Sequence, residues 1–186
     1  NLALKAERWT EAADLFARAL ELAQLDPYAK LDPVFSQAVL QTSRKAASEL
    51  ADRPDSQAQQ NREALLERVN AVAAEAAANL PENPQIQFEL GKALYKQKDY
   101  RAAITALDAA LALDSQHHLA WTYRAMSQYF LGEKEDAIAT FRKSLAIRPD
   151  WMTYSNLGKV YLAEGKPAEA VQVMQDWLKF EPNSEE

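Results

Sequence analysis

The feature that most constrains the fold of this chain is a recurrence of residue types at intervals of 33 or 34 residues. Gly132 and Gly165 are 33 residues apart, and Pro149 and Pro182 are separated by the same interval. Alanine follows the same frame at Ala103, Ala137 and Ala170. A period near 34 that is built from two helices indicates an array of helical repeats.

Three segments can be aligned in this frame: residues 84–117, 118–150 and 151–184. In a pair of antiparallel helices, close approach is possible only where side chains are small, so glycine and alanine mark the helix crossings. Large apolar residues beside these positions fill the grooves. Each pair leaves an apolar face that the next pair covers, so we expect neighbouring units to share their core.

The aligned segments resemble the tetratricopeptide repeat, a family with aromatic, small, Leu-Gly and proline residues at fixed positions. The middle segment supplies Trp121, Ala125, Gly132, Ala137, Phe141 and Pro149. The last segment supplies Tyr154, Leu157, Gly158, Tyr161, Gly165, Ala170, Met174 and Pro182. The first supplies Leu90, Gly91, Ala103, Leu107 and Ala110, with Ser115 where proline is usual. The resemblance implies an all-α fold, a right-handed superhelical array of antiparallel helix pairs, with about nine helices.

Residues 1–80 follow the pattern less closely, and we expect degenerate, lengthened repeat-like helices there. Trp9, Ala12 and Phe16 take positions of a second helix, so the first unit is expected to be truncated. We infer either a fragment of a longer protein or a preceding segment that was removed or is disordered. Proline-containing breaks bound helices expected over residues 34–50 and 56–79. The expected domains are therefore residues 1–80 and, with three full units, residues 81–186.

The charge of the chain is spread evenly. The net charge is −6, and residues 1–80 and 81–186 each contribute −3. A nucleic-acid surface needs clustered basic residues, so we expect no nucleic-acid partner. The sequence has no export signal and no apolar run long enough for membrane insertion. Cysteine is absent, which fits either redox compartment, so localisation stays unknown with the cytoplasm favoured.

Residue patterns typical of catalysis or metal binding are missing from this chain. His117 and His118 are the only histidines, and adjacent residues do not share a helix face as metal ligands usually do. We expect them in a loop that enters a helix at Leu119. No metalloprotease, nucleophile-elbow or phosphate-loop motif occurs. We therefore expect no enzyme activity, no cofactor and no metal site in this chain.

The resemblance also implies a concave groove, formed by the first helices of successive units. The residues that we expect to bind a peptide there are Phe88, Lys92, Tyr95, Tyr123, Met126, Tyr129, Phe130 and Asn156. Rigid aromatic rings and adaptable methionine suit an extended or helical peptide with apolar anchors, and flanking lysines suit an acidic group. The alternative is that Tyr95, Tyr129 and Phe130 pack between adjacent first helices.

One branch of the family holds the carboxylate tail of chaperones with a five-residue clamp of lysine, asparagine and arginine. The corresponding positions here are occupied by Phe88, Lys92, Tyr123, Met152 and Asn156. The clamp is therefore absent in this register, and chaperone-tail binding is disfavoured.

These observations favour a non-catalytic protein-protein interaction scaffold that binds a peptide segment of a partner protein. One alternative is a structural element that assembles with copies of itself through apolar ends near Trp9 and Trp177. Trp177 stands where a small residue is customary, so it covers its own unit, meets a second copy or precedes a continuing protein. The other alternative is a regulatory or substrate-recruiting arm of a larger enzyme or secretion component.

Overall fold

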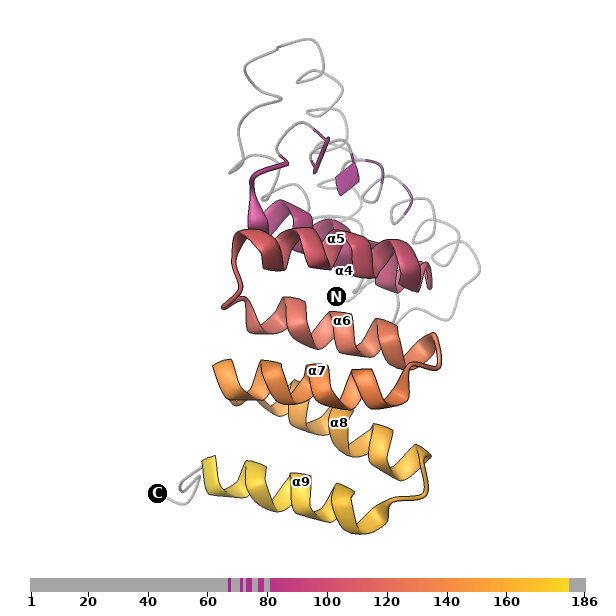
Figure 1. The fold of residues 1–186 in the computed structure, drawn as a ribbon, viewed down its shortest axis with the longest axis vertical. Helices are drawn as coiled ribbons and strands as arrows, with labels where there is room; N and C mark the ends of the chain where they lie inside the picture. Colours follow the sequence, from indigo (N-terminus) through magenta and orange to yellow (C-terminus); the bar gives the residue numbers. More distant parts are fainter. Residues whose placement is uncertain (1–66, 68–70, 72, 75–76, 79–80, 181–186) are drawn as a thin grey trace, which may run out of the picture. The chain divides into compact units, whose positions relative to one another are not determined.

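The structure, a computed structural model, describes residues 67, 71, 73–74, 77–78 and 81–180. The chain divides into two compact units, Asn1–Ala93 and Leu94–Glu186, and each is described by itself. Six helices span most of the described residues (Figure 1). They are α4 (Pro84–Lys96), α5 (Tyr100–Leu113), α6 (His118–Phe130), α7 (Lys134–Ile147), α8 (Trp151–Ala163) and α9 (Pro167–Phe180).

Four of these helices begin just after a side chain that caps their first turn. Asn83, Asp99, His117 and Asp150 each accept a hydrogen bond from the backbone N–H three residues further on, at 3.1 to 3.2 Å. Such a cap satisfies one of the backbone donors that a helix N-terminus leaves unpaired. The start expected at Leu119 was therefore wrong by one residue, because His117 caps the helix and α6 begins at His118.

The turns within the helix pairs use a left-handed residue at one position of the repeat. Gly132 and Gly165 have φ angles of +86° and +68°, which glycine adopts without steric cost. Lys98 occupies the corresponding place between α4 and α5 and has a φ of 65°. The turn between α4 and α5 therefore has the same left-handed residue as the other two turns, although lysine replaces glycine there.

The core of the second unit lies between successive helices. Ala125 and Phe141 are fully buried and form a cluster with Leu157, Val160 and Tyr161 of α8. Small residues allow this packing: a methyl group added at Gly158 would lie 3.0 Å from the Cε atom of Met174, on the paired helix. The packing of α6 and α7 on α8 is therefore the shared core that the repeat pattern predicts.

The all-α fold is confirmed, since the described residues contain helices and no strand. Each of the three expected units holds one helix pair. The helix expected over residues 34–50 and the truncated first unit lie outside the described residues. Of the helix expected over residues 56–79, residues 67, 71, 73–74 and 77–78 are described and helical. The boundary between the compact units, after Ala93, differs from the expected domain boundary after residue 80, which stays a prediction.

Candidate functional site

A pocket of about 260 Å³ opens in the second unit and is lined by residues of α4, α6, α7 and α8. One residue near the end of α4 and three residues of α6 form one wall, four residues of α8 form a second wall, and one residue of α7 completes the lining. The lining residues are Tyr95, Met126, Tyr129, Phe130, Phe141, Asn156, Lys159, Val160 and Ala163. Most of these side chains are apolar or aromatic, as is usual for a site that buries part of a ligand.

Aromatic rings build the first wall. The ring of Phe130 stacks on that of Tyr100, with centroids 4.8 Å apart and planes inclined by 10°. It also lies 6.0 Å from the ring of Tyr95 and 5.7 Å from that of Tyr129. Although it has these neighbours, Phe130 is 54% exposed. The wall therefore exposes to solvent an aromatic ring, that of Phe130, whose position is fixed by contacts with neighbouring rings.

Polar groups of the pocket come from α8. The side-chain amide of Asn156 donates to the Sδ atom of Met126 at 3.5 Å, which joins the two walls. Lys159, one turn further along α8, is exposed. Its ammonium is a cationic group beside a mostly apolar and aromatic lining, so a ligand with an acidic group next to an apolar one would meet complementary chemistry here.

Five of the eight residues that we expected in the groove line this pocket: Tyr95, Met126, Tyr129, Phe130 and Asn156. Their assignment as binding residues stays a prediction. The sequence analysis also left open that the aromatic residues pack between helices. In the structure, the rings of Tyr95, Tyr129 and Phe130 contact one another and also line the pocket.

The other three expected residues lie elsewhere. Tyr123 meets the ring of Tyr95 edge-on at 5.4 Å and does not line the pocket. Phe88 and Lys92 belong to the first unit, where Phe88 is only 3% exposed. The ammonium of Lys92 lies 5.0 Å from the centre of the Phe88 ring and 3.0 Å from the carboxylate of Glu89. The side chain of Phe88 is thus buried, and the assignment of Phe88, Lys92 and Tyr123 as binding residues stays a prediction.

The sequence analysis did not select Phe141 and Val160 as pocket residues. Both are buried members of the core cluster, with 0% and 4% exposure. The repeat pattern places Phe141 in the core, which is correct. Because the pocket reaches that core, the same residue also forms part of its lining.

Burial makes the phenol of Tyr95 a weaker acid than an exposed tyrosine, and this change in pKa can be measured. Desolvation, with smaller contributions from the Tyr100 and Tyr123 phenols, raises the pKa of Tyr95 from 10.0 to about 12. The neutral phenol is favoured in the folded protein, so this contribution to the free energy of unfolding is present below pH 10. It is lost as the pH rises from 10 to about 12.

We expect the ultraviolet difference titration between the wild type and Tyr95→Phe to report a phenol that ionises near pH 12. A difference curve centred near pH 10 would contradict the burial of this ring.

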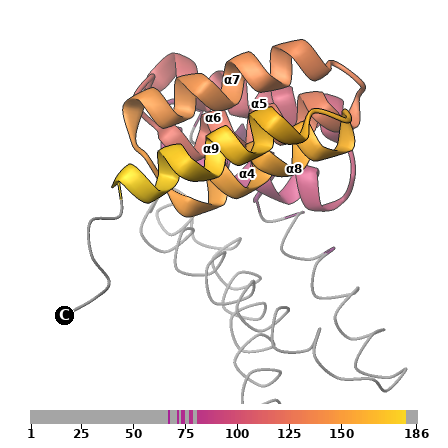
Figure 2. The same ribbon diagram turned by 90° about the horizontal axis from the view of Figure 1, so that it is seen from below.

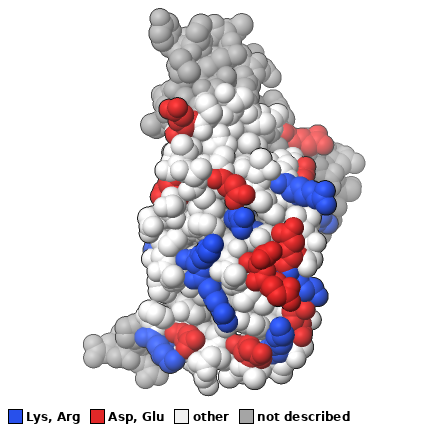
Figure 3. All heavy atoms as spheres, in the orientation of Figure 1, with Lys and Arg blue, Asp and Glu red and all other residues white. Residues whose placement is uncertain are grey.

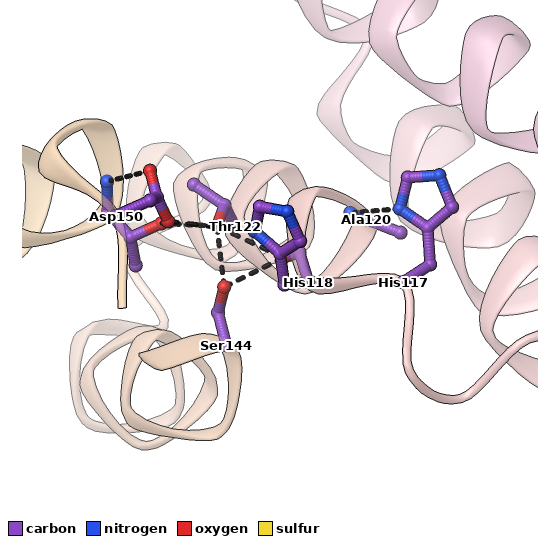
Figure 4. Close-up of polar contacts among 7 residues, drawn as sticks. His117, His118, Ala120, Thr122, Ser144 and Asp150 are labelled. Atoms are coloured by element: carbon purple, nitrogen blue, oxygen red, sulfur yellow. Dashed lines mark hydrogen bonds and ion pairs between the residues drawn. The ribbon is translucent and has the colours of Figure 1, made fainter. Parts of the chain in front are cut away.

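A second set of polar residues lies between α6, α7 and α8, away from the pocket lining (Figure 4). The Thr122 hydroxyl lies 2.8 Å from that of Ser144 and 2.7 Å from that of Thr153. Ser144 donates to the backbone oxygen of His118, and Thr153 donates to the Asp150 carboxylate. All three hydroxyl residues are buried and have partners, so the cluster joins three helices rather than offering a binding surface.

The histidines also have structural positions. His117 caps α6, and the Nδ1 atom of His118 lies 3.6 Å from the carboxylate of Asp150. Figure 4 shows the two rings well apart, with only that of His118 next to Ser144 and Asp150. Within the described residues, no group of three or more His, Cys, Asp or Glu side chains is arranged to hold a metal ion.

Charged side chains of both signs are interspersed on the molecular surface drawn in Figure 3. Several belong to ion pairs, among them Arg124 with Asp108 at 2.6 Å and Lys134 with Glu164 at 2.8 Å. A separate result concerns membranes: among residues 67, 71, 73–74, 77–78 and 81–180, no helix has the length and apolar character needed to span one.

Comparison with known protein families identifies the type of repeat in this chain. The sequence model of the tetratricopeptide repeat matches residues 41–118, 88–151 and 124–185. The chain therefore belongs to the tetratricopeptide repeat family, and its fold is that of a protein-interaction scaffold built from such repeats.

Relatives and solved structures agree with this assignment. Protein STIP1 homolog of Dictyostelium discoideum is 30% identical over 117 residues, which covers 58% of this chain and 20% of that protein. The chain thus spans about a fifth of the length of this relative. MamA from Desulfovibrio magneticus RS-1 has a TM-score of 0.60 and 14% identity, with coverage of 94% of this chain and 97% of MamA. The first repeat domain of Spaghetti (RPAP3), bound to the HSP90 peptide SRMEEVD, has a TM-score of 0.52 and 18% identity, with coverage of 56% and 83%. These two structures establish the fold alone.

Proposed function

We propose that this chain is a non-catalytic scaffold that binds a peptide segment of a partner protein at the pocket between α6 and α8. The observation that carries the proposal is the exposed aromatic wall of a 260 Å³ pocket, in which Phe130 is held by Tyr100 and Tyr95. A preformed ring loses little conformational entropy when a ligand covers it. An apolar side chain of the peptide inserts beside Phe130 and displaces water from both.

The polar residues of α8 determine which polar groups the peptide should carry and how it is oriented in the pocket. Asn156 has amide groups for hydrogen bonding, and the exposed Lys159 has an ammonium for an acidic side chain. The favoured ligand is therefore a segment with an apolar anchor followed or preceded by Asp or Glu. An exposed ion pair contributes little to affinity, so the anchor supplies most of it and Lys159 supplies orientation.

The comparisons support a peptide ligand and raise the question of which one. The similar Spaghetti (RPAP3) domain was solved with the acidic HSP90 peptide SRMEEVD. In this chain, the five positions of the carboxylate clamp hold Phe88, Lys92, Tyr123, Met152 and Asn156. Two of the expected cations are thus replaced by apolar side chains. We infer that the apolar anchor, and not a terminal carboxylate, dominates recognition.

A peptide selection followed by affinity measurement tests the proposal. Peptides selected from a random library against the wild-type chain are expected to share an apolar residue close to an acidic one. Phe130→Ala should weaken their binding roughly tenfold, because it removes a central aromatic contact. Fluorescence polarisation with labelled peptides measures this change.

The chain offers a matched control in Phe180, which is 57% exposed on α9 whereas Phe130 is 54% exposed. Phe180→Ala should leave peptide affinity unchanged. SRMEEVD serves as a second probe and should bind no better than a scrambled peptide of the same composition. Equal affinities of the wild type and Phe130→Ala for every selected peptide would contradict the proposed site, as would a selection that yields no binding peptide.

A further inference from the structure

Among the residues that line the pocket, Met126 is the one that carries sulfur. It lies in the lining with Tyr129 and Phe130, and it also packs against the buried core cluster. The chain has two other methionines, Met152 and Met174, and neither belongs to the lining. Oxidation of a methionine sulfur to the sulfoxide turns an apolar side chain into a polar one. The chemistry of the pocket can therefore be changed at this position.

The pocket gives small molecules a route to Met126. The side chain is half-buried, and the volume of about 260 Å³ beside it is several times the roughly 30 Å³ that a water molecule takes up in the liquid. Hydrogen peroxide is only slightly larger than water. Met174 has other surroundings: it belongs to α9, in front of α8 in the view from below (Figure 2), and its Cε atom would lie 3.0 Å from a methyl group added at Gly158.

A hydrogen-bond donor already faces the Met126 sulfur. The side-chain amide of Asn156 on α8 donates to the Sδ atom at 3.5 Å. A thioether sulfur is only a weak acceptor, whereas the oxygen of a sulfoxide carries more negative charge and accepts more strongly. The same amide can therefore hold the oxygen of an oxidised Met126 between α6 and α8, inside the pocket.

We propose that Met126 is an oxidation site, at which hydrogen peroxide converts the thioether to a sulfoxide and thereby switches off binding at the pocket. A lone pair of Sδ attacks one peroxide oxygen, so that the S–O bond forms and the O–O bond breaks. The proton of the attacked oxygen passes to the departing hydroxide, which leaves as water. The sulfur loses two electrons and the peroxide gains them. A methionine sulfoxide reductase with a thiol reductant reverses the change and releases the oxygen as water.

The expected effect on ligands follows from the chemistry of the lining. An apolar anchor that inserts beside Phe130 would have to cover the sulfoxide oxygen and separate it from solvent, which costs free energy. Met126 in its reduced form instead adapts to an apolar ligand. The inference rests on the proposed function, because it assigns a form of regulation to the same pocket.

Methionine variants of the full chain test the proposal. Replacement by leucine at both Met152 and Met174 leaves Met126 as the single methionine, and Met126→Leu is the reciprocal control. Each chain is treated with hydrogen peroxide, and peptide mapping by mass spectrometry locates the added oxygen. Binding is measured with the dye anilinonaphthalene sulfonate, whose apolar rings match the lining and whose sulfonate matches Lys159. The part of the dye emission that Phe130→Ala removes is assigned to the pocket.

Peroxide should weaken dye binding at the pocket roughly tenfold in the wild type and in the variant that keeps only Met126. Met126→Leu should retain after treatment the dye affinity that it had before. Methionine sulfoxide reductase should restore binding to the oxidised wild type. Circular dichroism should be the same before and after oxidation, because the sulfoxide acts on the pocket and not on the fold.

The proposal is overturned if Met126 is not oxidised in the folded protein, if its oxidation leaves dye binding unchanged, or if Met126→Leu responds equally. Loss of helicity on oxidation, or dye emission that Phe130→Ala does not alter, also overturns it. Selected peptides that bind equally well before and after oxidation of Met126 overturn it and leave the proposed function standing. A dye response that depends on Met126, with no peptide selected by the wild type, supports the oxidation site and contradicts the proposed function.

Discussion

Replacement of Phe141 by alanine is expected to lower the free energy of unfolding by about 3 to 5 kcal/mol. The ring is 0% exposed and belongs to the core cluster in which α6, α7 and α8 meet. Removal of a buried ring loses its transfer free energy and leaves a cavity that neighbours fill only partly. Because each helix pair of an array is stabilised mainly by its neighbours, damage at this junction affects both sides of it. Urea denaturation followed by circular dichroism measures the loss.

The matched control again uses Phe180, a more than half exposed phenylalanine. Phe180→Ala makes the same chemical change at the end of α9 and should cost less than about 1 kcal/mol, since little area is buried there. Similar denaturation midpoints for the two variants would contradict the position of Phe141 in the core. The result also bears on the pocket, because Phe141 lies in its lining: binding measurements with Phe141→Ala would mix two effects. Phe130 is for that reason the better probe of peptide binding.

The helix pairs could be predicted from the sequence because residue size at each repeat position follows from how the helices pack. Small residues recur where helices cross, and glycine recurs where the turn needs a positive φ, as at Gly132 and Gly165. Two local details escaped this reasoning. Histidine is not among the preferred helix caps, so the role of His117 was not predicted. Lysine is not a usual left-handed residue, and only the equivalence with Gly132 signals the conformation of Lys98.

The candidate site was predictable in part. Tyr95, Tyr129 and Phe130 followed from repeat positions that face the concave side in the family, and they do line one pocket. The burial of Phe88 was not predictable from those positions, because it depends on the surroundings of α4 in the first unit. The hydroxyl cluster of Thr122, Ser144 and Thr153 was missed for another reason. These residues are not equivalent positions of the repeat, so no recurrence in the sequence indicates that they meet.

The repeat register itself is tested most directly by enlarging a helix crossing. Ala137 of α7 is 0% exposed and occupies the small-residue position shared with Ala103 and Ala170, which are also buried. Ala137→Leu should lower the free energy of unfolding by about 1 to 3 kcal/mol, because the added carbons must displace well-packed neighbours. Ala139→Leu makes the same change at an exposed position of α7 and should have almost no effect. Urea denaturation of both variants gives the comparison. An unchanged midpoint for Ala137→Leu would refute the register, since a crossing that accepts leucine is not one that requires a small residue.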